Sequence, residues 1–404
     1  MNALVSIVLI LAVALPLLLA ALALARPSLA GTLASLAALP ALIYGLLWQP
    51  GAGVDLPSLL LGTRLGLTEL TRVFLLFTAF LWTAAGIYAR SYLGGADRGF
   101  FAFYLLAMAG NLGLVLARDI ATFYLFFSLM GFAAYGLVVH DGTQRALWAG
   151  KVYLVLVIVG EAMLLPAVLL AAAASGNDLA NVPSGVASSP YRDLIVVLTL
   201  GGFGVKAGAL PLHVWLPLAH PAAPTPASAV LSGAMIKAGL LGWLLFLPLG
   251  VAELAGWGTL CVVVGLTAAF YGVLVGLTQE NPKAILAYSS ISQMGFMTVG
   301  LGAALLAPQA RQLALTAVAL YAAHHALAKG ALFLGVGVSE RARGRQRWIV
   351  AGACCSPPSR SPARPSPAAP PPRPTSRRPR SRWPPRGRRP SKPCSSSAPS
   401  APPF

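Results

Sequence analysis

Four ionisable side chains lie in the middle of strongly apolar segments: Glu161, Lys206, Lys237 and Lys329. An uncompensated charge in the middle of a bilayer costs about 2.5 to 3.5 kcal/mol on insertion scales, so these groups are expected to face one another or water. Burial disfavours a charged lysine, and a nearby carboxylate favours it. Lys206 could therefore gain and lose a proton as its distance from a carboxylate such as Glu161 changes. This is the chemistry of a proton or cation relay.

Two adjacent histidines near the end of the apolar region extend this set. His325 and Lys329 are four residues apart and share a helix face, so they could continue one water-linked chain. His324 is equally consistent with a proton-carrying role and with a structural one. The proton or ion pathway predicted from the sequence comprises Glu161, Lys206, Lys237, His324, His325 and Lys329.

The stretch between Lys206 and Lys237 cannot form one uninterrupted helix. Pro211 lacks a backbone donor and clashes with the preceding turn, so the helix that carries Lys206 is expected to break just past it. Non-helical backbone at membrane depth is tolerated only inside protein or beside a water-filled cavity, so the break predicts a polar path. The residues expected to shape this break, rather than to carry protons, are Pro211, His213, Pro217 and His220.

Two further polar features lie in or beside the apolar segments. Lys283 begins a helix after an Asn-Pro pair and is expected to reach the membrane interface with its ammonium. Residues 288–293 place several hydroxyl and amide side chains inside a spanning segment. They either line the water path or hold neighbouring helices together by hydrogen bonds.

The composition is that of a polytopic membrane protein. Of the 404 residues, 57% are hydrophobic and only 10% are charged, which is far too apolar for an ordinary soluble domain. The net charge of +18 is misleading, because residues 341–404 hold 15 of the 29 Lys and Arg and none of the acids. The cysteines form no metal or haem pattern. We therefore expect no metal, no redox cofactor and no nucleic-acid partner for this chain.

Apolar runs of spanning length predict eleven transmembrane helices. They lie at about residues 3–25, 28–48, 67–89, 99–117, 119–139, 150–174, 193–215, 224–248, 255–277, 284–304 and 311–338. The Gly/Pro-rich stretch 50–66 is expected to form a loop or hairpin outside the membrane. The first run has no basic residue before it and is expected to remain as an uncleaved helix.

The loop charges predict the orientation in the cell inner (cytoplasmic) membrane. The loops on one side carry Arg26, Arg90, Arg98, Arg145, Lys151 and Lys283. The loops on the other side carry Arg64, Arg118, Arg192 and Arg311. The excess on the first side places the N-terminus outside and the C-terminal tail in the cytoplasm.

The composition changes abruptly at Arg341. Residues 351–404 contain 17 of the 33 prolines, interleaved with Arg, Ser and Ala, which predicts a disordered tail. One interpretation is a polybasic segment attracted to anionic lipid headgroups, at about 1 kcal/mol per basic residue. The other is a frameshift, because GC-rich codons read out of frame yield these residue types.

Blocks around these residues resemble the antiporter-like proton-translocating subunits of respiratory complex I, membrane-bound hydrogenases and Mrp antiporters. The blocks are residues 205–207, 211–217, 219–220, 223–226, 228–229, 235–239, 286–295 and 324–335. The similarity covers about residues 100–338. The block at 231–235 looks closer to hydrogenase-linked and Mrp members, since many complex I members carry a histidine where Ser232 stands.

The resemblance implies an all-α membrane fold of two inverted five-helix repeats, each with a broken helix. Ions would cross by half-channels that are joined along a central polar axis. By matching position, Lys206 is the lysine of the broken seventh helix, Lys237 the connecting lysine, and His325 or Lys329 the relay of the eleventh helix. The implied divisions are N-terminal helices in 1–98, a first repeat in 99–250, an incomplete second repeat in 251–340 and the tail in 341–404.

Two departures from the family pattern are evident. The fifth helix of family members usually carries a glutamate where this chain has Ser128, and Glu161 is the only mid-span acid that can take its place. Helices twelve to fourteen are missing, so the chain looks C-terminally truncated.

The expected function is that of a proton- or cation-translocating membrane subunit. It would belong to a redox-driven complex resembling NADH:quinone oxidoreductase or membrane-bound hydrogenase, or to an Mrp-type cation/proton antiporter. Its partners would be the other membrane subunits, the lipid bilayer and H+ or Na+, and this chain would perform no redox chemistry itself. The alternative is an inactive or scaffolding truncated subunit without transport of its own.

Overall fold

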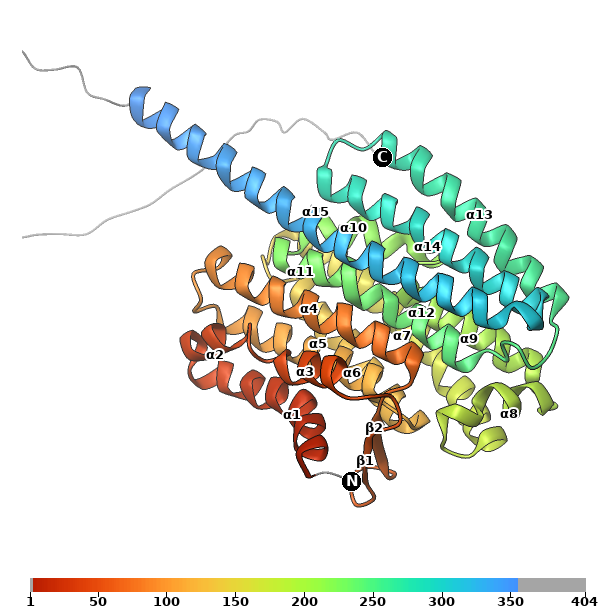
Figure 1. The fold of residues 1–404 in the computed structure, drawn as a ribbon. Coiled ribbons are helices and arrows are strands. Elements are labelled where there is room, and N and C mark those ends of the chain that lie inside the picture. The colour runs from red at the N-terminus through yellow and green to blue at the C-terminus, as the bar shows by residue number, and fades with distance from the viewer. Residues whose placement is uncertain (1–2, 355–404) are drawn as a thin grey trace, which may run out of the picture. The chain divides into compact units, whose positions relative to one another are not determined.

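The computed structural model describes residues 3–354, and these are almost entirely helical (Figure 1). Ten helices within this part of the chain are long and apolar enough to cross a membrane. The helices are α1 Ala3–Ala25, α2 Pro27–Leu33, α3 Leu39–Leu47, α4 Glu69–Tyr92, α5 Arg98–Leu116, α6 Ile120–Val138, α7 Gln144–Ser175, α8 Val182–Ser188, α9 Arg192–Ala207, α10 Trp215–Ala222, α11 Thr225–Val230, α12 Ile236–Phe246, α13 Ala255–Leu277, α14 Pro282–Leu306 and α15 Arg311–Cys354. Short helical segments are η1 Leu179–Asn181, η2 Leu212–Val214, η3 Leu231–Met235 and η4 Pro308–Ala310.

The chain divides into two compact units by its internal contacts. The first, Met1–Ile349, contains all the elements discussed below. The second, Val350–Phe404, contributes only the end of α15 to the described residues.

The structure differs from the expected spans at residues 28–48. This segment forms two short helices, α2 and α3, separated by a turn at residues 34–38. Pro40 lies in the first turn of α3. A proline there has no N–H to donate to the preceding turn but is well placed to begin a helix, so the segment restarts instead of continuing.

The second difference concerns the tail. Residues 341–354, expected to be disordered, continue α15 as a helix to Cys354. The first proline after Arg341 is Pro357, so nothing in this stretch blocks helical hydrogen bonding. Residues 355–404, on which the lipid-binding and frameshift interpretations rest, lie outside the described residues.

Glycines bring neighbouring helices into backbone contact. A Cβ built on Gly265 of α13 would lie 2.6 Å from the carbonyl oxygen of Gly295 on α14, and the converse distance is 2.5 Å. Figure 1 shows these two helices side by side. Similarly, a Cβ on Gly110 of α5 would lie 2.5 Å from the backbone nitrogen of Met130 on α6. Small residues allow membrane helices to approach one another closely. At such short distances even the short side chain of a serine can reach the neighbouring helix.

The expected hairpin is present outside the helical bundle. Strands β1 Gly53–Leu56 and β2 Thr63–Gly66 pair antiparallel, with Asp55 opposite Arg64. The fully buried Asp119 fastens β2 to α6, because its carboxylate accepts hydrogen bonds from the backbone N–H groups of Arg64 and Thr122, both at 2.8 Å. The second of these bonds is the N-cap of α6.

Substituting Asp119 with alanine is expected to lower the free energy of unfolding by about 1 to 3 kcal/mol, because one cap is lost and the Arg64 amide loses its acceptor. The measurement is the midpoint of thermal unfolding in detergent. Asp55→Ala is the matched control, since Asp55 is exposed on the same hairpin. Equal midpoints for the two variants would contradict the anchoring role of Asp119.

Candidate ion-translocation site

The helix that carries Lys206 ends directly after it. α9 stops at Ala207, and Gly208 adopts a left-handed conformation with φ 71° and ψ 36°, which a glycine accepts without steric cost. The chain resumes as η2 and α10. The indole N–H of Trp215 donates to the carbonyl oxygen of Val205 at 2.7 Å. The break therefore lies where Pro211 predicted it, and the indole satisfies a carbonyl at the end of the helix.

Lys206 is buried in a pocket of aromatic side chains. Its side chain is 3% exposed, and its Nζ donates a hydrogen bond to the hydroxyl of Tyr153 on α7 at 2.8 Å. That hydroxyl donates in turn to the carbonyl of Gly131 on α6 at 2.8 Å. The Nζ also lies 5.3 Å from the centroid of the Tyr153 ring, close enough for a cation–π contact. Trp215 packs edge-on against the same ring, with centroids 5.1 Å apart.

The carboxylate of Glu161 also lies near Gly131. A Cβ built on Gly131 would be 3.7 Å from Glu161 Oε1 and 3.9 Å from Lys206 Nζ. These two charged groups are thus close, but they are not among the direct ion pairs of the described residues, which extend to 4.0 Å. Glu161 Oε2 accepts a hydrogen bond from Ser128 Oγ at 2.7 Å. The carboxylate therefore sits beside the position where related subunits carry their glutamate.

Lys237 and Lys329 each donate a hydrogen bond to a backbone carbonyl, and a contact between two serine hydroxyls lies between these carbonyl groups. Lys237 is fully buried, and its Nζ donates to the carbonyl oxygen of Ser232, within the π-helical turn η3, at 2.6 Å. Ser232 Oγ lies 2.8 Å from Ser290 Oγ on α14. Ser290 Oγ donates to the carbonyl oxygen of Leu286, and Lys329 Nζ donates to the same oxygen, both at 2.9 Å. The two ammonium groups thus bind the backbone, and the serine contact links the residues that hold them.

The two adjacent histidines of α15 face different surroundings. His325 is 3% exposed, and neither ring nitrogen has a hydrogen-bond partner within residues 3–354. It lies one helical turn before Lys329, which is also buried, on the same face of α15. His324 is exposed on the outer surface of the helix. The structure therefore buries His325 on the face that carries Lys329 and leaves His324 outside.

The rings of the two histidines at the helix break contact aromatic side chains of later helices. His213 Nε2 lies 3.2 Å from the hydroxyl of Tyr271 on α13. His220 is fully buried and stacks on Phe333 of α15, with ring centroids 4.6 Å apart. Both of its ring nitrogens lack a partner among the described residues. Both rings thus connect the break to the helices of the second half of the chain.

Three participants in this arrangement were not predicted individually from the sequence: Tyr153, Gly131 and the pair Ser232–Ser290. A signal existed for Tyr153, because it precedes Glu161 by eight residues and so shares its helix face. Gly131 and the serine pair act across helices. Their roles depend on which faces of separate spans meet.

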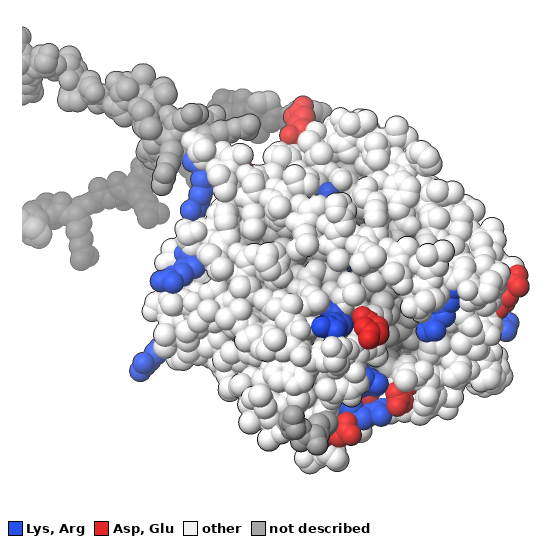
Figure 2. Space-filling model, viewed as in Figure 1, with Lys and Arg blue, Asp and Glu red and all other residues white. Residues whose placement is uncertain are grey.

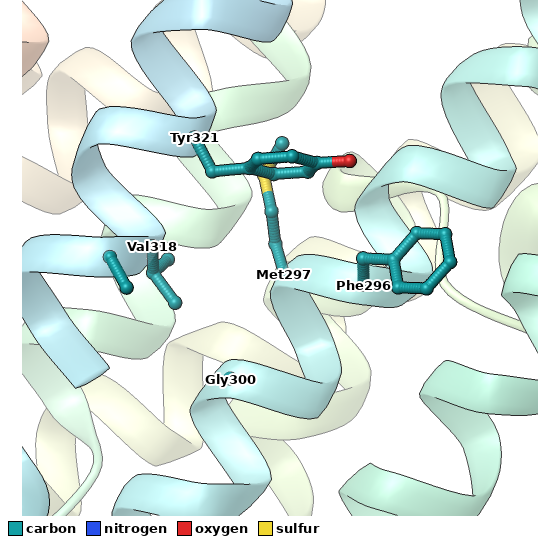
Figure 3. A pocket seen from close by; sticks show the side chains of 6 residues that line it. Phe296, Met297, Gly300, Val318 and Tyr321 are labelled. Carbon is teal, nitrogen blue, oxygen red and sulfur yellow. The ribbon is translucent and has the colours of Figure 1, made fainter.

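The face of the molecule shown in Figure 2 is largely uncharged, with a few scattered charged groups. A pocket of about 280 Å³ opens between α14 and α15, and Figure 3 shows the side chain of Met297 reaching toward the ring of Tyr321 there. Its lining is Phe296, Met297, Gly300, Ala317, Val318 and Tyr321. These side chains carry no charge, so the pocket contributes nothing to the chain of ionisable groups.

Ten helices of spanning length within the described residues, one of them broken beside a buried lysine, enclose several buried basic side chains. This combination defines an integral membrane protein with ionisable side chains in its interior. Comparison with known families agrees, because residues 117–352 match the transmembrane family described as NADH:quinone oxidoreductase/Mrp antiporter. The chain belongs to this family.

Known relatives come from several membrane complexes. Hydrogenase-4 component B of Escherichia coli (strain K12) is 32% identical over 289 residues, which is 68% of this chain and 43% of that protein. An Na(+)/H(+) antiporter subunit of Alkalihalophilus pseudofirmus is 30% identical over 303 residues, or 74% of this chain and 59% of that protein. The chain thus spans about half the length of these relatives.

A solved structure has the same fold. A chain in the structure of the Mrp complex from Dietzia sp. DQ12-45-1b superposes with a TM-score of 0.72 at 28% identity. The match covers 83% of this chain and 38% of that chain.

Proposed function

We propose that this chain is a proton- or cation-translocating subunit of a larger membrane complex. The other subunits would either perform the redox chemistry that drives translocation or exchange a cation for a proton together with this chain. The observation that carries the proposal is the position of Lys206, which is buried at a helix break with the Glu161 carboxylate near the same glycine, Gly131. The kinship with hydrogenase-4 component B and with an Na(+)/H(+) antiporter subunit supports it.

The arrangement can move a proton by a small change in distance. Tyr153 holds the Lys206 ammonium and Ser128 holds the Glu161 carboxylate. When the carboxylate approaches, it favours the charged lysine, and when it withdraws, burial favours release of the proton. Moving one charge against 100 mV costs about 2.3 kcal/mol, which a partner subunit must supply. Lys237, Lys329 and His325 would receive and pass on the ion.

We further infer that the chain lies in the cell inner membrane with its N-terminus outside. The loop charges support this orientation. Hydrogen bonds between loops support the grouping of these loops on shared sides of the membrane. Arg64 donates hydrogen bonds to Asn177 and Asp178, both at 3.1 Å, on one side. On the other, Arg341 donates to the carbonyl of Ser91 at 3.1 Å.

Glu161→Gln is the first test. It is expected to lower ion flux roughly tenfold or more, because the variant keeps the shape of the side chain but removes the charge that favours protonated Lys206. The measurement is proton uptake into inverted membrane vesicles that contain the whole complex, followed with a pH-sensitive dye and normalised to the amount of the chain. Glu253→Gln, at an exposed acid in a loop, is the matched control. Unchanged flux in Glu161→Gln would refute the assigned role.

A rescue variant sharpens this test. Ser128 Oγ is 2.7 Å from the Glu161 carboxylate, so a glutamate at position 128 would bring an acid into the same region. Combining Ser128→Glu with Glu161→Gln is therefore expected to restore much of the lost flux. Recovery would show that the charge near Lys206 matters more than the helix that provides it.

A further inference from the structure

A cavity of about 510 Å³ lies between α4, α12 and α15, and its lining includes none of the buried lysines. The three helices run alongside one another in Figure 1. α4 and α15 both begin at this cavity, and their first residues, Glu69 and Arg311, line it. The proposed orientation places this end of the helices at the outer surface of the membrane. The cavity has no role in the proposed ion translocation.

The lining of the cavity changes from charged to apolar along the helices. Val73 lies one turn beyond the acid that begins α4. Leu315 and Ala319 lie one and two turns beyond the arginine that begins α15. The antiparallel α12 contributes Leu244 and Leu245 near its end. A molecule with a polar head and an apolar chain therefore finds charged groups at the mouth of this cavity and hydrocarbon further in.

The two charges line one cavity without neutralising each other. Glu69 and Arg311 are exposed, and neither belongs to an ion pair of 4.0 Å or less within residues 3–354. The first turn of α15 contains no acid that could neutralise the arginine. The stem of Arg311 lies against Gly250, where an added Cβ would clash with it. This contact limits the positions of the guanidinium, so one positive and one negative group stay apart at the same mouth.

We propose that this cavity binds a phospholipid whose headgroup carries a phosphate and a primary ammonium, as in phosphatidylethanolamine. The guanidinium of Arg311 binds the phosphate, because its planar set of N–H donors matches the phosphate oxygens. The carboxylate of Glu69 accepts hydrogen bonds from the ammonium, which has three N–H groups to donate. An acyl chain covers the apolar part of the lining. The site depends on the membrane surface of this chain and not on ion translocation.

Other occupants match these groups less well. Phosphatidylglycerol has the phosphate but no cation, so it would bring an uncompensated negative charge near Glu69. The quaternary ammonium of phosphatidylcholine has no N–H to donate to that carboxylate. A segment of another subunit would have to bring an acid and a base to the same place, whereas phosphatidylethanolamine carries both charges in one headgroup.

The test measures lipid binding to the purified full-length chain by native mass spectrometry. The protein, exchanged into a detergent that removes lipid, is titrated separately with phosphatidylethanolamine, phosphatidylglycerol and phosphatidylcholine. The wild type is expected to bind one phosphatidylethanolamine about tenfold more tightly than the other two lipids. Arg311→Gln is expected to weaken this binding about tenfold, because the phosphate loses a charged donor.

Glu69→Gln separates the two halves of the headgroup. It is expected to weaken the binding of phosphatidylethanolamine about tenfold, because the ammonium loses its charged acceptor. Phosphatidylglycerol has no ammonium and is expected to bind this variant at least as tightly as it binds the wild type. Retained binding of phosphatidylglycerol also shows that the variant is folded.

Matched controls exist for both charges. Arg192 begins α9 on the side that also carries Arg311, and it lies 3.6 Å from the carboxylate of Asp193. Glu253 is an exposed acid in the loop before α13. Neither Arg192 nor Glu253 lines the cavity. Arg192→Gln and Glu253→Gln are therefore expected to leave the binding of phosphatidylethanolamine unchanged.

A second pair of variants tests the apolar part of the cavity. Thr316 is an exposed residue of the lining, so Thr316→Trp places a large ring where the acyl chain is expected. This variant is expected to weaken the binding of all three lipids. Leu313→Trp is the control on the same helix, because Leu313 is 76% exposed and does not line the cavity. It is expected to bind phosphatidylethanolamine as the wild type does.

Three results would overturn the inference. The first is wild-type affinity for phosphatidylethanolamine in Arg311→Gln, Glu69→Gln and Thr316→Trp alike. The second is an equal loss of phosphatidylethanolamine and phosphatidylglycerol in Glu69→Gln, since the acid would then not act on the ammonium. The third comes from the intact complex with the photo-crosslinking residue p-benzoylphenylalanine at position 316. Capture of phospholipid there is expected, and capture of another subunit would show that protein fills the cavity.

Discussion

Lys206→Met is expected to reduce ion flux a hundredfold or more, to about the background of vesicles without the complex. Methionine has similar length but cannot bind a proton, so the step that depends on Lys206 and Glu161 is lost. Folding is expected to survive, because removing a buried ammonium also removes the cost of its desolvation. The hydroxyl of Tyr153 keeps its bond to the Gly131 carbonyl. The measurement is dye-reported proton uptake, with the amount of chain in the membrane determined in parallel.

The control for this variant is Lys151→Met. Lys151 lies two residues before Tyr153 on α7, but its side chain is exposed. Its substitution removes one positive charge without touching the interior and should leave flux near the wild-type level. If both variants retained flux, Lys206 would not be on the ion path. The chain would then be better described as a scaffold.

Gly239→Val is expected to remove most of the folded protein. A Cβ at Gly239 of α12 would lie 2.5 Å from the carbonyl oxygen of Phe203 and 2.6 Å from the nitrogen of Ala207. Both atoms belong to the last turn of α9, on either side of Lys206. A methyl group there already forces the two backbones apart, and overpacking of this kind costs about 1 to 3 kcal/mol. The larger valine should exceed that range and move the helix break itself.

The yield of monodisperse protein in detergent, followed by its thermal midpoint, checks this result. Gly239→Ala should lower both by less than Gly239→Val. Gly335→Val is the control, because a Cβ at Gly335 of α15 would meet nothing within 4 Å. Wild-type yield and midpoint for Gly239→Val would mean that α12 and α9 do not make this contact.

Local chemistry made much of the fold predictable. Spanning helices follow from runs of apolar residues, and the break follows from Pro211, because a proline acts on its own turn whatever surrounds it. The same reasoning does not predict the interruption at residues 28–48, where Pro40 lies in the first turn of a second short helix. Membership of the family was also predictable, since the blocks around Lys206 and Lys237 are long and occur in a fixed order.

The contacts of the site were less predictable. A span that is apolar on every side gives no periodic signal of which face meets which neighbour. The sequence therefore could not separate His325, which is buried, from His324, which is exposed one residue away. Nor could it pair Ser232 with Ser290, which are 58 residues apart along the chain. Such pairs depend on how each helix is rotated about its axis, which tertiary packing decides.

The hydrogen bonds at the end of α9 determine which parts of the site can move. The carbonyl of Val205 accepts from the Trp215 indole and from the backbone of Gly208, and the carbonyl of Gly204 accepts from Ala209. None of these bonds involves the side chain of Lys206, so all of them persist whether the lysine is charged or neutral. We therefore expect the backbone of the broken helix to keep its place during proton transfer. In the proposed function, the distance between Lys206 and Glu161 would then change through movement of these two side chains, without bending of the main chain.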